Sequence, residues 1–480
     1  MNIISSKYKT QYIAFIVALI SGIISYGFEL SHFTLSIDEE ATNNYLHMID
    51  FGRWGHAFLK EYIFPEPWAP FFSLFFALIA ISAASSSCCF LLQLNTRESV
   101  LFSALFASFP QMAYQLQFSN QAETVGIALF LSSISTIFFR NKKLWGSLSF
   151  VILNVIVTSI YQSFLFFSAS LITILILKEI CDGKNNINGW IKESFKAASL
   201  LLISVVIYSS IAKAIKDHYD LHSVSYFSSM ISWGNTGISE TLINIIGYIK
   251  TSAYTIPYYG FNFYFISSIA IIISCFAAKK YGLRSFTLAI VVAFVVMASP
   301  FFLNIIIGSG TPARTLSQMP LVFAAGIVLL IRHIKKDAIH YALAVVFVLI
   351  SCSYISKMFY SDFIASEQDK RIAYNLMSDI HHKYPETKNG NVKLITHGNI
   401  TQINPWANYR SDDFGVSFFQ RGISSRIGRF IYTNGIGNVT PAGEEELNDE
   451  QRIILQKMNI WNGDQGIEMS NGVVIVKLSE

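Results

Sequence analysis

The feature that most constrains this 480-residue chain is a series of charge-free apolar runs. A transmembrane helix needs about 20 mainly apolar residues, and most of these runs reach or approach that length. Only 14% of the residues are charged, whereas soluble proteins carry about a quarter. The runs cover residues 10–28, 67–96, 99–122, 124–139, 144–177, 197–212, 251–278, 285–313, 315–331 and 338–356. The sequence therefore predicts an α-helical polytopic membrane protein.

Positive charge between the runs predicts the orientation. The proposed cytoplasmic loops hold 16 Lys and Arg residues and the short outer loops hold six, and such asymmetry places the basic loops inside. Because basic loops flank both ends of 144–177, this run is predicted to be a hairpin that turns near 159–163. The result is about 11 transmembrane helices, with a cytoplasmic N-terminus and an external tail. Residues 1–357 form the predicted transmembrane catalytic domain, with outer loops 29–66 and 213–250.

The tail, residues 358–480, differs in composition from the rest. It carries 12 basic and 15 acidic residues, and turn signals follow or precede its short apolar strings at 392–395 and 473–478. Two helical patterns, at 423–432 and 450–458, lie between these strand candidates. We predict a small soluble α/β domain. The five cysteines show neither a disulfide framework nor a metal-binding spacing, so no metal site is predicted on the cysteines.

The first outer loop contains three consecutive carboxylates, Asp38, Glu39 and Glu40. Crowded carboxylates near a low-dielectric region raise one another's pKa values. One interpretation is a solvated acidic surface that helps to keep the loop outside. The other is a functional group of carboxylates that supplies a general base or a metal site.

Further along the same loop, apolar residues between Leu46 and Tyr62 recur at helical spacing and predict a helix on the membrane surface. The sequence Gly52-Arg53-Trp54-Gly55-His56 interrupts this pattern. Glycines beside an arginine allow the backbone and the guanidinium to approach an anion closely. The alternative is an interfacial Trp54 beside an Arg53 that extends its charge to the membrane surface.

Two other residues in the predicted outer loops are candidates for binding a substrate. Glu123 borders the apolar run that begins at Thr124, where it either interacts with a helix dipole or hydrogen-bonds a polar substrate such as a sugar. Arg314 follows the flexible turn 308–313 at the start of a span. An arginine at a helix N-terminus opposes the dipole, so a bound phosphate would account for it better.

This layout resembles the C-type glycosyltransferases: many spans, the acidic pair Asp38-Glu39 after the first span, surface helices in that loop and a soluble C-terminal domain. Within that group the chain resembles the bacterial O-antigen glucosyltransferases of serotype-conversion systems. The resemblance implies a multi-pass protein of the bacterial inner membrane with a periplasmic tail. It also implies an undecaprenyl-phosphate-linked sugar donor, expected to carry glucose, and an O-antigen or related lipid-linked glycan as acceptor. Asp38 and Glu39 match the family's catalytic acidic pair.

The residue chemistry agrees with such a transfer. When an acceptor hydroxyl attacks the anomeric carbon, a carboxylate must remove its proton and a cation must stabilise the departing phosphate. We therefore expect Asp38 or Glu39 to act as the base. The substrate-binding candidates are Glu40, Arg53, Trp54, His56, Glu123 and Arg314. Membrane lipids are expected partners, whereas neither nucleic acid nor a cofactor is, and metal dependence is left open.

Two other classes of protein remain as alternatives. One is an O-antigen polymerase or another envelope transferase, which should have basic outer loops for an anionic glycan. The other is a lipid or glycan transporter, which should place ionisable residues near the bilayer midplane. The acidic first loop and the charge-free spans favour a glycosyltransferase that acts at the membrane surface.

Overall fold

The structure, a computed structural model, describes residues 2–41, 43–141, 143–184, 186–221, 230–254, 263–406 and 414–480. It divides into two compact units. We call Met1–Leu30 with Asn44–Ser356 the helical unit, and Ser31–Asn43 with Lys357–Glu480 the sheet unit. The segment Ser31–Asn43, which the sequence-based division assigned to the transmembrane domain, thus clusters with the tail. Within the predicted outer loop 213–250, residues 222–229 lie outside the described residues.

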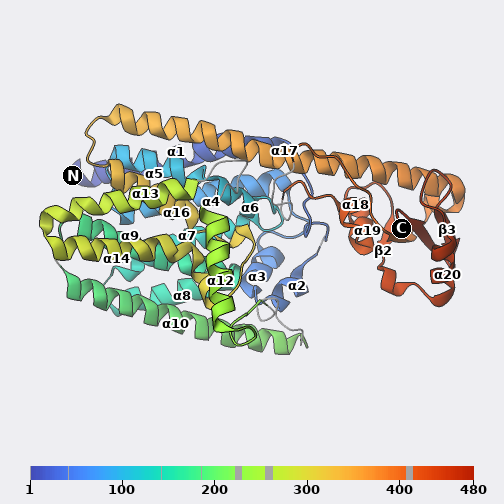
Figure 1. Cartoon of the computed structure of the whole chain (residues 1–480), viewed down its shortest axis with the longest axis horizontal. Coiled ribbons are helices and arrows are strands. Elements are labelled where there is room, and N and C mark those ends of the chain that lie inside the picture. The colour runs from blue at the N-terminus through green and yellow to red at the C-terminus, as the bar shows by residue number, and fades with distance from the viewer. Residues whose placement is uncertain are drawn as a thin grey trace. The chain divides into compact units, whose positions relative to one another are not determined.

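The helical unit consists of apolar helices that run alongside one another (Figure 1). Its longer helices are α1 (Asn2–Ser31), α4 (Pro70–Leu91), α5 (Thr96–Ala107), α7 (Ala122–Phe139), α8 (Leu144–Ile160), α9 (Leu165–Cys181), α10 (Ile187–His218), α13 (Phe263–Cys275), α14 (Leu283–Ala298), α16 (Met319–Ile331) and the first part of α17 (Asp337–Lys383). Short turns at their ends are η1 (Pro110–Met112), α6 (Ala113–Leu116), η2 (Gln162–Phe164), η3 (Lys250–Tyr254), η4 (Phe276–Tyr281), η5 (Ser299–Phe301), α15 (Phe302–Ile307) and η6 (Ala313–Thr315).

Each predicted span overlaps one of these helices. Among the described residues, eight helical segments are long and apolar enough to cross a membrane, and α8 and α16 are shorter apolar helices. The predicted hairpin is confirmed, because α8 ends at Ile160 and α9 begins at Leu165, with η2 between them. The structure therefore supports a helical membrane protein, while the total of 11 crossings stays a prediction.

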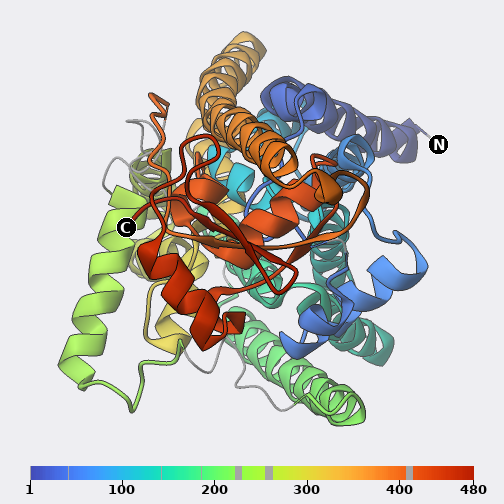
Figure 2. The ribbon, with the colours of Figure 1, turned by 90° about the vertical axis from the view of Figure 1, so that its right-hand side faces the viewer.

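The helix predicted between Leu46 and Tyr62 is present as two short helices, and a third short helix lies within the loop 213–250. The pattern between Leu46 and Tyr62 forms α2 (Tyr45–Asp50) and α3 (Trp54–Tyr62), broken at Gly52 and Arg53. The helix α12 (Ile238–Ile249) leaves apolar side chains such as Ile238 and Ile243 exposed. It runs across the direction of the long helices (Figures 1 and 2), as expected of a helix that lies in the membrane interface.

A buried polar network joins α7, α8 and α9. The Asn154 amide donates to Ser135 Oγ at 3.2 Å, and Ser168 Oγ donates to Asn154 Oδ1 at 3.0 Å. Ser168 also lies within hydrogen-bond distance of the Ser132 hydroxyl at 2.9 Å. Small hydroxyl-bearing residues allow helices to approach closely in a membrane and to hydrogen-bond across the interface. This network fixes how the three helices face one another.

The sheet unit contains the end of α17, a four-stranded sheet in its described residues and short helices. The sheet has the order β2-β1-β4-β3. Strands β1 (Val392–His397), β2 (Val439–Pro441) and β4 (Val473–Lys477) are parallel, and β3 (Ile467–Ser470) is antiparallel to β4. The other elements are η7 (Pro385–Asn389), α18 (Phe418–Arg421), α19 (Ser424–Thr433), η8 (Glu444–Glu446) and α20 (Asp449–Lys457).

Strand alternation explains how the sheet acquires its core. Ile395 in β1 and Val473 and Ile475 in β4 share one face, where they pack against Leu455 and Met458 from the α20 segment. The helix α19 packs against β1 and β2. The two predicted helical patterns and the two predicted strands of the tail are therefore confirmed, and they form the small α/β fold that the sequence indicated.

Candidate functional site

The three consecutive carboxylates lie in a tight turn of the sheet unit, which we call the acidic turn (Ser36–Glu40). Asp38 has a φ of 82°, a left-handed conformation that Asp and Asn tolerate better than most residues. Its carboxylate Oδ1 lies 2.9 Å from Arg426 Nη1 in α19, and the side chain is 48% exposed. The same guanidinium nitrogen lies 3.1 Å from Glu40 Oε1. Arg426 therefore holds two of the three predicted acids in place.

The other two acids are buried. Glu39 Oε2 accepts a hydrogen bond from the Ser36 backbone N–H at 2.9 Å, and Glu40 Oε2 accepts one from Asp38 N–H at 2.7 Å. Burial raises the pKa of Glu40, and the charge of Arg426 opposes that rise. Asp38 is thus the acid of this turn whose carboxylate is most open to a substrate.

A second group of predicted residues lies in the helical unit, around the break between α2 and α3. Gly52 adopts a φ of 74°, and a Cβ at this position would lie 2.7 Å from Tyr208 Oη. The Gln162 amide donates to the Phe51 carbonyl at 2.8 Å, and Tyr208 Oη donates to the Gly52 carbonyl at 3.1 Å. The turn itself therefore requires a glycine at position 52. The hydrogen bonds from Gln162 and Tyr208 hold this turn and so fix the position of Arg53.

Uncharged side chains hold the guanidinium of Arg53 in position. Its Nε donates to Gln162 Oε1 at 3.4 Å, and its guanidinium carbon lies 4.3 Å from the centre of the Tyr161 ring. Among the described residues, no carboxylate forms an ion pair with Arg53. Burial lowers the pKa of Arg53, and the nearby charge of Arg314 lowers it further. We call Arg53 and Arg314 the arginine pair, because the charge of Arg314 acts on Arg53 and two like charges that act on each other attract an anion.

The sequence had suggested that Arg314 lies at a helix N-terminus. The structure places it in η6 instead, because α16 begins only at Met319. Its guanidinium carbon lies 4.6 Å from the centre of the Phe118 ring. The Gln111 amide donates to the carbonyl of Ala313 beside it. The position of Arg314 is therefore set by packing of η6 against η1 and α6, and the argument from an opposed helix dipole no longer applies.

A buried ion pair joins α3, the helix that follows Arg53, to α7. Lys60 Nζ and Glu123 Oε1 are 2.7 Å apart, with side chains only 4% and 1% exposed. In the same region Thr124 Oγ1 donates to the Gln121 carbonyl and lies 2.8 Å from His56 Nδ1. Since the one hydroxyl proton is already used, His56 must donate from Nδ1, which leaves Nε2 as an acceptor. Burial lowers the pKa of His56 to about 3, so the ring is neutral at pH 7.

Several buried polar atoms here have no hydrogen-bond partner among the described residues. They are the amide oxygen and nitrogen of Gln115, Glu123 Oε2 and Trp54 Nε1. Gln115 and Glu123 are almost completely buried, and α6, which holds Gln115, packs against η6. An unsatisfied buried polar group costs about 1 to 3 kcal/mol. Such groups are expected where a polar ligand or water completes the site.

Sequence reasoning had named eight site residues, and the structure distributes them over two groups. Asp38, Glu39 and Glu40 lie in the acidic turn of the sheet unit, and the other five lie in the helical unit. Sequence reasoning missed Arg426, Lys60, Gln162 and Tyr208 as partners of these residues. Lys60 had been counted only as a loop charge. The excess of acids over bases in loop 29–66 is the one signal that a cation from elsewhere, such as Arg426, would pair with them.

Comparison with known families gives a match that covers most of the helical unit. A family model described as Glucosyl transferase GtrII matches residues 27–331, which is more than half of the chain and includes the acidic turn and the arginine pair. No curated protein matches the chain. The matched range excludes Arg426 and the four strands of the sheet unit.

Proposed function

Because the chain belongs to the GtrII glucosyl transferase family, that of the serotype-conversion O-antigen glucosyltransferases, we propose that its glucose donor is a polyprenyl phosphate, undecaprenyl phosphate in bacteria. The acceptor would be O-antigen or a related lipid-linked glycan on the periplasmic face of the inner membrane. The observation that carries this proposal is the arginine pair, since Arg53 has neutral partners and no ion-pairing carboxylate among the described residues. A lipid-linked phosphate is the anion that a membrane enzyme of this family would hold there.

In the proposed reaction Asp38 is the general base. The acceptor hydroxyl attacks the anomeric carbon while Asp38 takes its proton, and the bond from this carbon to the phosphate oxygen breaks. Attack from the side opposite the phosphate inverts the configuration at the anomeric carbon. Exposure of the Asp38 carboxylate supports this role, and the left-handed backbone at Asp38 is the kind of strain that functional sites retain. Glu39, the other member of the acidic pair, would hold the turn in shape.

The remaining candidates would bind substrate. Arg53 and Arg314 would stabilise the phosphate as it departs with a negative charge, because a guanidinium can bind phosphate oxygens bidentately. Glu123 Oε2, Trp54 Nε1 and the neutral His56 ring would hydrogen-bond sugar hydroxyls. Glu40 would act through Arg426, because both Glu40 and Asp38 contact the same guanidinium nitrogen. No step requires a cofactor.

We expect Arg53→Ala and Arg314→Ala each to lower kcat/KM for the donor by roughly 10- to 100-fold, because a lost charge-assisted hydrogen bond costs about 1.5 to 3 kcal/mol. The measurement is transfer of labelled glucose from polyprenyl-phosphate glucose to acceptor glycan in proteoliposomes. Lysine at either position should restore only part of the rate, since it keeps the charge but not the bidentate geometry. Arg284→Ala is the matched control, because Arg284 is an exposed arginine in the first turn of α14. Normal rates in both alanine variants would place the phosphate elsewhere.

The proposed periplasmic location of the tail gives a second prediction. The native cysteines are buried or half-buried, so a cysteine introduced at an exposed site can be labelled selectively. In intact spheroplasts, a membrane-impermeant maleimide should label Lys457→Cys in α20 but not Lys280→Cys in η4. Permeabilisation should expose the second site. The reverse pattern would invert the proposed topology.

A further inference from the structure

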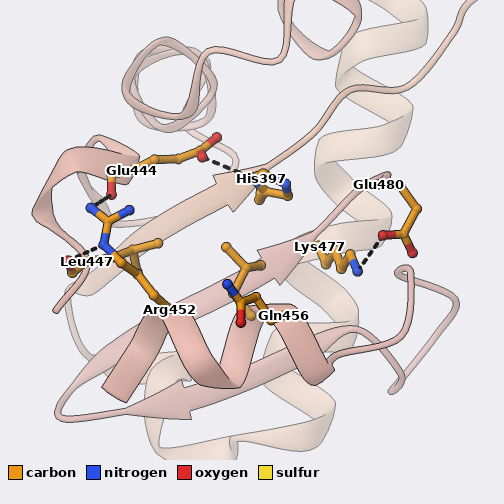
Figure 3. Close-up of a pocket in the computed structure, with 8 residues that line it drawn as sticks. His397, Glu444, Leu447, Arg452, Gln456, Lys477 and Glu480 are labelled. Atoms are coloured by element: carbon orange, nitrogen blue, oxygen red, sulfur yellow. Dashed lines mark hydrogen bonds and ion pairs between the residues drawn. The ribbon is translucent and has the colours of Figure 1, made fainter. Parts of the chain in front are cut away.

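The sheet unit contains a pocket of about 340 Å³ that none of the proposed catalytic groups line (Figure 3). Its walls combine the ends of two strands, η8 and one side of α20. Figure 3 shows that His397, Arg452 and Lys477 surround an open space with Gln456 below them. The volume is at the lower end of the range for small-molecule sites, about 300 to 1,000 Å³, and is suited to a ligand of one or two sugar rings.

The position of the pocket follows from the topology of the sheet. From β1 the chain crosses to β2 on one side, and it later returns to place β4 on the other side of β1. The order of strands therefore reverses between the parallel neighbours β1 and β4. In open α/β sheets, ligands bind outside the carboxyl ends of the strands at such a reversal. His397 and Lys477 are the last residues of β1 and β4, pair with each other in register, and both line the pocket.

The polar groups of the pocket alternate in sign. His397 Nδ1 lies 2.8 Å from Glu444 Oε2, and Lys477 Nζ lies 2.9 Å from Glu480 Oε2. Arg452 donates from Nε and Nη2 to the carbonyls of Leu447 and Glu444. A phosphate or an acidic sugar would meet two carboxylates here, and a metal ion would meet two cationic side chains. Neither an anion nor a metal ion therefore matches this mixture of positive and negative side chains.

A neutral sugar does match this mixture of side chains, because each sugar hydroxyl both donates and accepts a hydrogen bond. Arg452 and Lys477 supply donors, and the Glu444 and Glu480 carboxylates supply acceptors. The pocket also contains Leu447 and Leu455, and apolar side chains can cover the C–H groups of a pyranose ring. The site thus combines an apolar patch with a few fixed polar groups, as small-molecule sites do.

We propose that this pocket binds a neutral hexopyranose residue of the acceptor glycan and so anchors the chain that receives glucose. This inference rests on the proposed function for the identity of its ligand. The anchor would lie outside the region that the family match covers. It would raise affinity for a long acceptor without taking part in the chemical step.

The test uses the full chain in nanodiscs, because glycosidic detergents would compete for the pocket. Binding of methyl α-D-mannoside, methyl α-D-galactoside and methyl α-L-rhamnoside is measured by saturation-transfer NMR, with inorganic phosphate as competitor. We expect at least one glycoside to bind and phosphate not to displace it. Gln456→Trp, which fills the pocket from an exposed position on α20, should abolish the signal. Arg452→Ala should weaken binding roughly tenfold. Lys457→Gln, the next residue on α20 but not part of the pocket, should bind as the parent does.

The outcomes separate this inference from the proposed function. Absence of binding for every glycoside, displacement by phosphate, or unchanged binding in Gln456→Trp would overturn the pocket assignment. In transfer assays Gln456→Trp should raise KM for polymeric acceptor several-fold and leave KM for the donor unchanged. If the protein transferred no glucose from polyprenyl phosphate, the proposed function would fail, while glycoside binding would still test the pocket.

Discussion

Asp38→Asn should reduce glucose transfer by about 100- to 10,000-fold, the usual cost of losing a general base. Asparagine keeps the size of the side chain and tolerates the left-handed backbone at this position. Arg426 would retain its contact with Glu40, so the acidic turn should stay folded. The loss should appear in kcat at saturating donor, measured with polyprenyl-phosphate glucose in proteoliposomes, while donor affinity stays near that of the parent.

Asp220→Asn is the matched control for this experiment. Asp220 is also exposed and has a φ of 51°, but it lies in neither proposed site, so its replacement should leave transfer unchanged. Glu39→Gln should cost less than Asp38→Asn, and Glu40→Gln should be mild. Near-normal turnover by Asp38→Asn would eliminate the mechanism, and a larger defect in Glu39→Gln would move the base by one residue.

The second large effect concerns stability. Lys60→Met should destabilise the helical unit by about 3 to 5 kcal/mol, because it leaves the buried Glu123 carboxylate without its counter-ion. Methionine has a similar length and can fill the space of the lysine side chain, so the missing charge dominates the effect. The measurement is the midpoint of denaturant-induced unfolding in mixed micelles, followed by tryptophan fluorescence.

Two further variants show whether the charge is the cause. The double variant Lys60→Met with Glu123→Gln should recover most of the lost stability, because no uncompensated charge then remains buried. Lys178→Met removes one partner of the more exposed pair with Asp182, and it should cost less than about 1 kcal/mol. A Lys60→Met protein as stable as the parent would contradict the buried ion pair.

The helical unit was largely predictable because lipid imposes one requirement on the backbone. A segment in the hydrocarbon must satisfy its own hydrogen bonds, so charge-free runs and helices coincide. Hydropathy marks where lipid contact ends, however, and not where a helix ends. The last run was predicted to stop at 356, whereas α17 continues to Lys383. Asp369 in that extension accepts hydrogen bonds from Ser417 Oγ and Phe418 N–H, a long-range reason for a buried acid in the helix.

The candidate site was less predictable for a related reason. Runs and motifs identify single residues, but their partners come from distant parts of the chain. Arg426 contacts the acidic turn from a helix close to the end of the sequence, and no spacing rule links the two. The role of Gly52, beside Arg53, could not be predicted from the sequence for the same reason. Its presence suggested an anion, whereas the structure uses Gly52 to make a turn beneath Tyr208.

The hydrogen-bonded contact among α7, α8 and α9 also bears on how the chain is made. In an isolated α8 the Asn154 amide would keep only its hydrogen bond to the Phe150 carbonyl of the same helix, and polar atoms in lipid are costly when they lack partners. Ser135 and Ser168 supply the other partners of the amide only when both neighbouring helices are present. During membrane insertion, α8 therefore gains from remaining next to α7 until α9 has followed. The three helices would then leave the insertion machinery as an associated group and not one at a time.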